Sequence, residues 1–235
     1  MRRLASLLLL LLLALPTPAV AAWAFVLGNS ETSSDGILAY TSNVTANNLL
    51  IVLIGHATNS TATVVDTQLN TWASAVNFYS VGNDYSGQIL FAVAGSTGAN
   101  TVTVTVIGGG NELTIAEYSG NATASPLDQT ASAEGTSTAA ASSSAVTTTD
   151  GQLILGGILS SGAITAAGGS VVDVGLTGVP VNTALTSKTQ VSAGSINTTA
   201  TIAPSSAWLA LMATFKAVAA GGSVAPQRGL MGVGQ

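Results

Sequence analysis

The chain has 235 residues, of which 6% are charged and 47% hydrophobic, with a single histidine and no cysteine. A formal charge of −5 with only five cations excludes a nucleic-acid-binding surface, which needs clustered Lys and Arg to neutralise phosphates. The missing cysteines exclude a disulfide scaffold, and together with the single histidine they argue against the usual zinc sites and against any other metal or cofactor.

The first residues have the three parts of a secretory signal peptide. Arg2 and Arg3 form a basic start, residues 4–15 are apolar, and Ala19-Val20-Ala21 is a small-residue cleavage site. The apolar stretch is shorter than the roughly 18 to 20 residues that span a bilayer. We therefore expect residues 1–21 to be removed. The mature chain is then secreted, to the extracellular space or the cell surface, with the periplasm as an alternative and no membrane contact.

Strand patterns dominate the rest of the chain, because β-branched residues alternate with polar ones between Gly, Asn, Asp and Ser. The clearest case is residues 101–106, where threonines occupy one face and valines the other. No segment after the leader has a helical period. In chain order, the predicted strands are 23–27, 37–40, 49–55, 61–65, 72–79, 88–93, 101–106, 112–118, 145–149, 153–159, 171–174, 188–191, 196–202 and 208–216.

An internal repeat is also expected, because residues 103–115 resemble residues 199–211 at a constant offset of 96. The pattern predicts one β-sandwich, of immunoglobulin-like or jelly-roll type, over residues 22–218, with related halves at about 22–121 and 122–218. Residues 122–144 separate the halves as a linker or a long crossing connection. Residues 219–235 are expected to be a flexible tail.

Several motifs add a resemblance to these patterns. They are NNLLIVLI (47–54), VVDTQLNTW (64–72), NTVTVTV (100–106), IAEYSG (115–120), SPLDQT (125–130) and WLALMATFK (208–216). Together they resemble a widespread group of uncharacterised secreted β-sandwich proteins of environmental bacteria and phage-associated sequences. The resemblance implies a fold and a location, because the motifs are strand and turn signatures. Leu69 departs from the group, which has glycine at this place in the turn.

Seven aromatic residues could form a sugar-stacking surface, namely Trp23, Trp72, Phe78, Tyr79, Tyr85, Tyr118 and Trp208. The preferred candidates are Trp72, Phe78, Tyr79 and Tyr85. Phe78 and Tyr79 precede the predicted loop 80–87, which contains Tyr85, so this loop is the best exposed candidate for glycan binding. The alternative is that the tryptophans at strand starts, Trp72 and Trp208, belong to the core or its edge.

Glu117 is the most unusual acid, because strand alternation places it in phase with the apolar Leu113 and Ile115. In the repeat it corresponds to Ala213. A carboxylate that faces a core needs a partner or a raised pKa, which makes Glu117 a candidate for function. It could also serve the structure by bonding to a neighbouring loop.

The remaining polar candidates have structural alternatives. Asp66 and Asn70 fit a turn that caps backbone amides, with calcium as the competing interpretation. The same two interpretations apply to Asn83 with Asp84 and to Glu31 with Asp35. His56 could belong to a Ser-His-Asp arrangement only if an activated serine were present, and no Gly-x-Ser-x-Gly elbow occurs. Glu112 and Glu117 are five residues apart and point to opposite faces of one strand, so they do not form a glycosidase pair.

These observations favour a non-enzymatic structural or adhesive surface protein that acts through sheet edges and loops. Its expected partners are further copies of itself, other surface proteins, or glycans. A sheet with few lysines at its edges is open to lateral assembly. A carbohydrate-binding module that uses the loop aromatics is the alternative, and a glycan-active enzyme comes third.

Overall fold

The computed structural model describes residues 22–33, 35–56, 59–106, 111–177 and 181–219, which form sixteen β-strands and no helix. The strands are β1 (Ala24–Ser33), β2 (Ile37–Ala39), β3 (Leu49–His56), β4 (Thr63–Asp66), β5 (Ala73–Ser80), β6 (Tyr85–Val93), β7 (Thr101–Thr105), β8 (Asn111–Ser119), β9 (Leu127–Ala141), β10 (Ala145–Val146), β11 (Gln152–Ser160), β12 (Ala163–Ala166), β13 (Val171–Leu176), β14 (Asn182–Gln190), β15 (Ser195–Ile196) and β16 (Thr199–Phe215). Among the described residues there is no helix that could cross a membrane. The predicted leader and the tail beyond Ala219 lie outside them.

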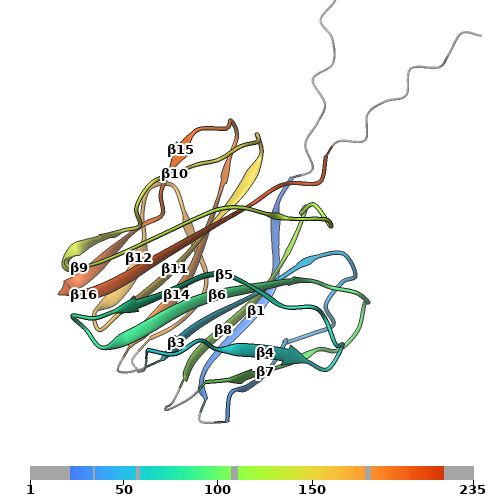
Figure 1. Ribbon diagram of the computed structural model, residues 1–235, viewed down its shortest axis with the longest axis horizontal. Helices are drawn as coiled ribbons and strands as arrows, with labels where there is room; N and C mark the ends of the chain where they lie inside the picture. Colours follow the sequence, from blue (N-terminus) through green and yellow to red (C-terminus); the bar gives the residue numbers. More distant parts are fainter. Residues whose placement is uncertain (1–21, 34, 57–58, 107–110, 178–180, 220–235) are drawn as a thin grey trace, which may run out of the picture.

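The strands form antiparallel sheets, so the all-β prediction is confirmed. One sheet has the order β1-β8-β3-β6-β5, and a small sheet has the order β2-β7-β4. The other large sheet has the order β12-β16-β11-β14-β13, with β9 also paired to β16, and β10 pairs with β15. Figure 1 shows the five-stranded sheet lying between the β4–β7 layer and the layer that contains β11, β14 and β16.

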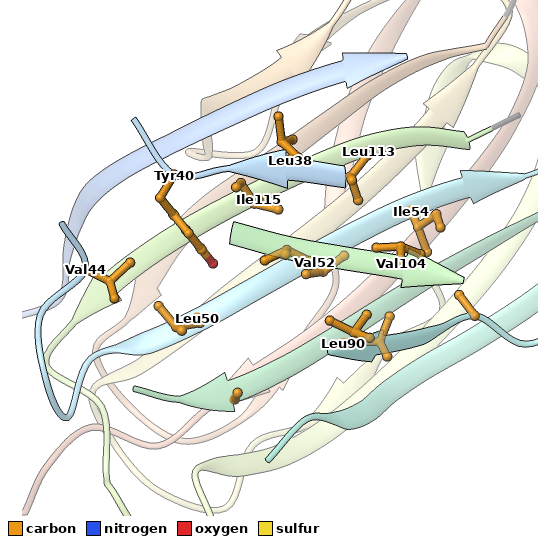
Figure 2. Packing of buried hydrophobic residues seen from close by; sticks show 14 of the residues in the cluster. Leu38, Tyr40, Val44, Leu50, Val52, Ile54, Leu90, Val104, Leu113 and Ile115 are labelled. Carbon is orange, nitrogen blue, oxygen red and sulfur yellow. The ribbon is translucent and has the colours of Figure 1, made fainter. Parts of the chain in front are cut away.

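Buried side chains hold these layers together. One cluster joins the small sheet to the five-stranded sheet and includes Leu50, Val52 and Val104 (Figure 2). A second cluster lies between the two large sheets and includes Leu49, Ile51 and residues of β11, β14 and β16. A third, smaller cluster lies on the far face of the six-stranded sheet.

The composition of β3 follows from this layering. Its residues Leu49–Ile54 form a continuous apolar run, and all of them are fully buried. Leu50, Val52 and Ile54 belong to the first cluster, whereas Leu49, Ile51 and Leu53 belong to the second. A strand covered on both faces gains from apolar residues at every position, so the usual alternation disappears.

The two large sheets have the same strand order and the same irregularities. The order β1-β8-β3-β6-β5 in the first half is matched by β9-β16-β11-β14-β13 in the second. A β-bulge in β5 between Ser74 and Val76 is matched by a bulge in β13 between Val172 and Val174. A β-bulge is a specific local feature. Its presence at the matching place in both sheets is therefore a closer structural similarity than strand order alone.

The small sheet also has a counterpart. Leu38 pairs with Val102 in the first half, and Ala140 pairs with Ala200 in the second, where the end of β9 and the start of β16 replace β2 and β7. β12 pairs with β16 as β4 pairs with β7. In addition, β1 lies against β13 and β5 lies against β9. Exchanging the two halves therefore reproduces the arrangement of the edges.

The register corrects the predicted repeat at its last strand. The matching bulges align Val52 of β3 with Gly156 of β11, and hence Leu50 with Ile154. Leu50 lies opposite Glu117, and Ile154 lies opposite Thr214. The residue that takes the place of Glu117 is therefore Thr214, whereas the constant offset of 96 pointed to Ala213. The offset is wrong by one here because alternating low-complexity strands match almost equally well in neighbouring registers.

The predicted linker over residues 122–144 is wrong for most of its length. Leu127–Ala141 forms β9, a fifteen-residue strand paired along β16. Its side chains are mostly Ala, Ser, Thr and Gly, so no apolar alternation marks it in the sequence. The strand β12 was likewise not predicted, and β14 begins at Asn182 instead of at residue 188.

Candidate functional site

The four aromatic candidates for glycan binding do not form one surface. Trp72 packs partly buried against the first cluster, and Phe78 packs against the second. Tyr79 donates a hydrogen bond to Asp84 (2.7 Å) at the surface. The prediction that Tyr85 is an exposed loop residue is wrong, because β6 begins at Tyr85 and only 9% of the residue is exposed. The turn is shorter than predicted, which draws Tyr85 into the core.

Trp72 does line a hollow of about 330 Å³ beside β4 and β5. The most buried polar side chain there is Gln88, whose amide oxygen accepts from the Ala62 amide (2.9 Å) and whose nitrogen donates to Ser74 (3.1 Å). Since both ends of this amide have protein partners, the hollow offers little polar recognition.

Asp66 organises the turn in which it was expected to act as a cap. Its Oδ1 accepts from the Asn70 amide (2.9 Å), and its Oδ2 accepts from the side chains of Asn70 (2.8 Å), Trp72 (3.1 Å) and Asn100 (3.1 Å). Burial raises the pKa of Asp66, but the donors from Asn100, Asn70 and Trp72 together bring it below its usual value of 3.8. Both carboxylate oxygens are thus committed to the protein itself.

Glu117 is fully buried and faces the first cluster, in phase with Leu113 and Ile115. Its Oε1 accepts hydrogen bonds from the Thr45 amide (2.9 Å) and from the side chain of Asn48. These contacts fix the turn before β3, where Asn47 has a positive φ of 70°. Glu117 therefore serves as a cap for this turn.

Tyr40 lies in the same cluster and reaches toward the five-stranded sheet in Figure 2. Its hydroxyl donates to the Ala116 carbonyl (3.4 Å). Burial, followed by the charges of Glu117 and Asp66, raises the pKa of Tyr40 well above 10, so this hydroxyl stays protonated. In this cluster, the Tyr40 hydroxyl is thus a neutral hydrogen-bond donor, and the Glu117 carboxylate caps a turn.

The other polar candidates also have structural surroundings. His56 is buried at the end of β3, and Glu112 lies beside Gly55 on the face opposite to Glu117, where burial raises its pKa. Asp35 caps the Ile37 amide (3.2 Å), and Asn83 donates to Ser80 (2.8 Å). Glu31 lies in β1 opposite Leu113.

A different site stands out between β1 and β13, where the edges of the two large sheets meet. It is a pocket of about 280 Å³ lined by Trp23, Phe25, Tyr118, Val171, Asp173 and Ser187, among others. Aromatic walls and a carboxylate converge here beside a hydroxyl, which is the usual composition of a small-molecule site.

The polar side of the pocket consists of the Tyr118 hydroxyl, the Asp173 carboxylate and the Ser187 hydroxyl. Tyr118, fully buried in the second cluster, donates to Asp173 Oδ2 (2.6 Å). Burial and the neighbouring Asp173 charge raise the pKa of Tyr118 well above 10, so it remains a donor. The hydrogen bond from Tyr118 holds the carboxylate in place through one of its two oxygens.

The bulge in β13 explains how Asp173 reaches the pocket. Strand alternation would send Asp173 and Val174 to opposite faces, but Val174 packs on the second cluster while Asp173 bonds to Tyr118 of the same cluster. A β-bulge adds one residue and re-aims a side chain in this way. Asp173 is therefore the extra residue of the bulge, turned inward.

The apolar side is formed by Phe25 and Trp23. The Phe25 ring stands edge-on to Tyr118, with 5.7 Å between ring centroids, and 41% of the residue remains exposed. The Trp23 indole donates its N–H to the Gly151 carbonyl (2.8 Å). With its only polar group satisfied, Trp23 offers the pocket an apolar ring surface.

The pseudo-equivalent position, where β5 and β6 of the first half meet β9 and β16 of the second, is filled and apolar. By register, Tyr118 corresponds to Phe215, Ser187 to Phe91, and the bulge residue Asp173 to Ala75. Phe91 and Phe215 pack edge-to-face there, with 5.4 Å between ring centroids. The same backbone thus closes the space with aromatic rings at one position and keeps it open and polar at the other.

Sequence patterns did not point to this pocket, because its residues come from five separate segments. Trp23 and Tyr118 were among the seven aromatics considered for sugar stacking, but nothing in the sequence brought them together, and the acid inside the valine-rich Val171–Val174 run is a signal that could have pointed to the site. Comparison of the chain with family models, with curated proteins and with solved structures finds no match.

Proposed function

We propose that this protein is a secreted, non-enzymatic adhesive module that holds a surface ligand in the pocket between β1 and β13. The observation that carries the proposal is the contrast between the two equivalent positions. Packing alone favours the filled version with Phe91 and Phe215, so the polar, open version with Ser187 and Asp173 gives up apolar contacts. Natural proteins retain such features where binding requires them.

The fold we infer is a duplicated β-sandwich in which each half has a jelly-roll order. In the first half, β1-β8-β3-β6 face β2-β7-β4, and the second half repeats this with β9 and β16 each serving both layers. The first half then comprises about residues 22–121, and the second half about residues 122–218. Jelly rolls occur in lectin and capsid domains, which is an argument from analogy only.

A non-catalytic role is supported by what the buried acids do. Glu117 caps the turn before β3, and Asp66 holds the turn after β4. Asp128 accepts hydrogen bonds from Thr148 and Gln152. Each of these three carboxylates stabilises the architecture, whereas Asp173 lines the pocket.

Lateral assembly through sheet edges is less favoured. Bulges interrupt the edge strands β1, β5 and β13, and bulged edges pair poorly with another chain. Adhesion through the pocket therefore replaces self-assembly as the leading form of the hypothesis.

The test is to convert the open position into the filled one. The triple variant Tyr118→Phe, Asp173→Ala and Ser187→Phe copies Phe215, Ala75 and Phe91 of the equivalent filled position, so we expect it to fold. Fluorescently labelled wild-type protein should be retained on cell-envelope and polysaccharide-coated surfaces, and the filled variant should wash off. Equal retention of both proteins, or no retention of the wild type, would show that the proposal is wrong.

A further inference from the structure

We infer that the ligand of the pocket is a single neutral sugar ring, bound with its C–H face on the aromatic wall and a hydroxyl on Asp173. This inference rests on the proposed function, because it names the ligand class of the same pocket. Two of the seven aromatics that the sequence suggested for sugar stacking, Trp23 and Tyr118, line this pocket, whereas the four preferred candidates do not.

The aromatic wall suits a ring with one apolar face. Phe25 is held edge-on to Tyr118, so its orientation is fixed before a ligand arrives. Trp23 is fixed by its bond to the Gly151 carbonyl. The negative faces of such rings attract the slightly positive C–H groups of a pyranose, and rings that are already ordered lose little entropy on binding.

The polar side suits a hydroxyl donor. Tyr118 occupies Oδ2 of Asp173, and no described residue donates to Oδ1. A sugar hydroxyl that donates to Oδ1 forms a charge-assisted hydrogen bond, which is stronger than one between neutral groups. The Ser187 hydroxyl, which also lines the pocket, adds a second polar group on this side.

The charges around the pocket favour a neutral ligand. An acidic ligand would be attracted by Lys188, which borders the pocket and donates to the Gly168 carbonyl (3.4 Å), but repelled by Asp173 on a protein that is negative overall. A cationic ligand would be attracted by Asp173 but repelled by Lys188. A neutral sugar ring meets no like charge and can donate and accept hydrogen bonds.

The size limits the ligand to about one ring. The volume of about 280 Å³ lies just below the range of roughly 300–1,000 Å³ that is usual for drug-sized ligands. Val171, with 58% of its surface exposed, lies at the rim, so the pocket opens to solvent on this side. A terminal sugar of a longer chain could therefore enter while the rest stays outside.

The test is titration of the purified protein with methyl glycosides of glucose, galactose, mannose, N-acetylglucosamine and xylose, followed by protein-detected NMR or calorimetry. Methyl glucuronide serves as the charged comparison. We expect at least one neutral glycoside to bind and to shift signals of pocket residues. We also expect the glucuronide to bind at least about tenfold more weakly, because it meets the Asp173 charge.

Matched variants connect binding to the two sides of the pocket. Phe25→Ala should weaken binding by about tenfold or more, because it removes the stacking surface. Val26→Ala is the control, since Val26 is the next residue, is exposed to 42% against 41%, and does not line the pocket. Asp173→Asn keeps an acceptor for Tyr118 but removes the charge, so it should also weaken binding by about tenfold.

The outcomes separate the inference from the proposed function. If no neutral glycoside binds, or if Phe25→Ala and Val26→Ala weaken binding equally, the sugar inference is wrong. It is equally overturned if the glucuronide binds as tightly as the neutral glycosides. If the sugar inference fails but the filled variant still loses surface retention, the protein is adhesive and its ligand belongs to another class. If the filled variant is retained like wild type, the proposed function itself is wrong.

Discussion

Replacing Leu69 by glycine should stabilise the protein. Leu69 has φ at 58°, in the left-handed region, which costs a residue with a side chain about 1–2 kcal/mol. Its side chain is 87% exposed, so truncation removes little apolar burial. Glycine loses more backbone freedom on folding, at a cost of roughly 0.5–1 kcal/mol. The difference predicts a net gain of about 0.5–1 kcal/mol in the free energy of unfolding.

The surrounding turn supports this estimate. The Leu69 amide donates to the Asp66 carbonyl (3.1 Å), and the next amide, of Asn70, donates to the Asp66 side chain (2.9 Å). Both bonds use the backbone of residues 69 and 70, so glycine preserves them. The positive φ is therefore imposed by the turn and persists in the variant.

The assay is urea unfolding together with calorimetry. For a domain of this size we expect the melting temperature to rise by about 1–4 °C. Val191→Gly is the matched control, because Val191 is 81% exposed but has no positive φ. That variant should lose about 0.5–1 kcal/mol. Destabilisation of Leu69→Gly by as much as the control would refute the reasoning.

Three further predictions concern buried acids and sheet packing. Asp66→Ala removes the acceptor of four hydrogen bonds. It should lower the free energy of unfolding, measured in urea, by about 3–5 kcal/mol. A loss below about 1 kcal/mol would mean that water replaces the carboxylate as the acceptor. Hydrogen bonds lower the folded-state pKa of Asp66 and Asp128, so the stability that they contribute is present above about pH 4 and is lost as pH falls through their folded pKa values. Acid titration of Asp66→Asn should show a smaller loss than wild type, and an identical curve would contradict this assignment. Gly157→Val should lower the free energy of unfolding by about 1–3 kcal/mol, because a Cβ at residue 157 would lie 2.6 Å from Leu53 Cδ1 of the facing sheet. The control is Gly82→Ala, where a Cβ would meet nothing within 4 Å and stability should change by less than about 0.5 kcal/mol.

The all-β class and most strand positions could be predicted because they depend on local alternation. The valines and threonines of residues 101–106 form β7 with Val102 and Val104 buried, as their alternation requires. Leu49–Gly55 was found for a different reason, namely its length and its bounding polar residues. The strand β9 was missed because burying an alanine or serine side chain changes the free energy little compared with leaving it exposed. The order of these residues therefore does not reveal which face of the strand is buried.

The inward position of Glu117 followed from local phase, whereas its partners did not. Thr45 and Asn48 come from a turn about 70 residues earlier, and only the fold brings them to the carboxylate. The pocket was missed for the same reason. It depends on a bulge at Asp173 and on the contact between β1 and β13, and neither can be read from a single segment.

Surface retention of the filled variant tests the central claim most directly. Wild-type protein and the variant Tyr118→Phe, Asp173→Ala, Ser187→Phe are compared on the same polysaccharide-coated surface, after calorimetry shows that both are folded. We expect the variant to melt at the same or a higher temperature than wild type and to be no longer retained. Retention of a folded, filled variant at the wild-type level would contradict the claim that this pocket is the binding site.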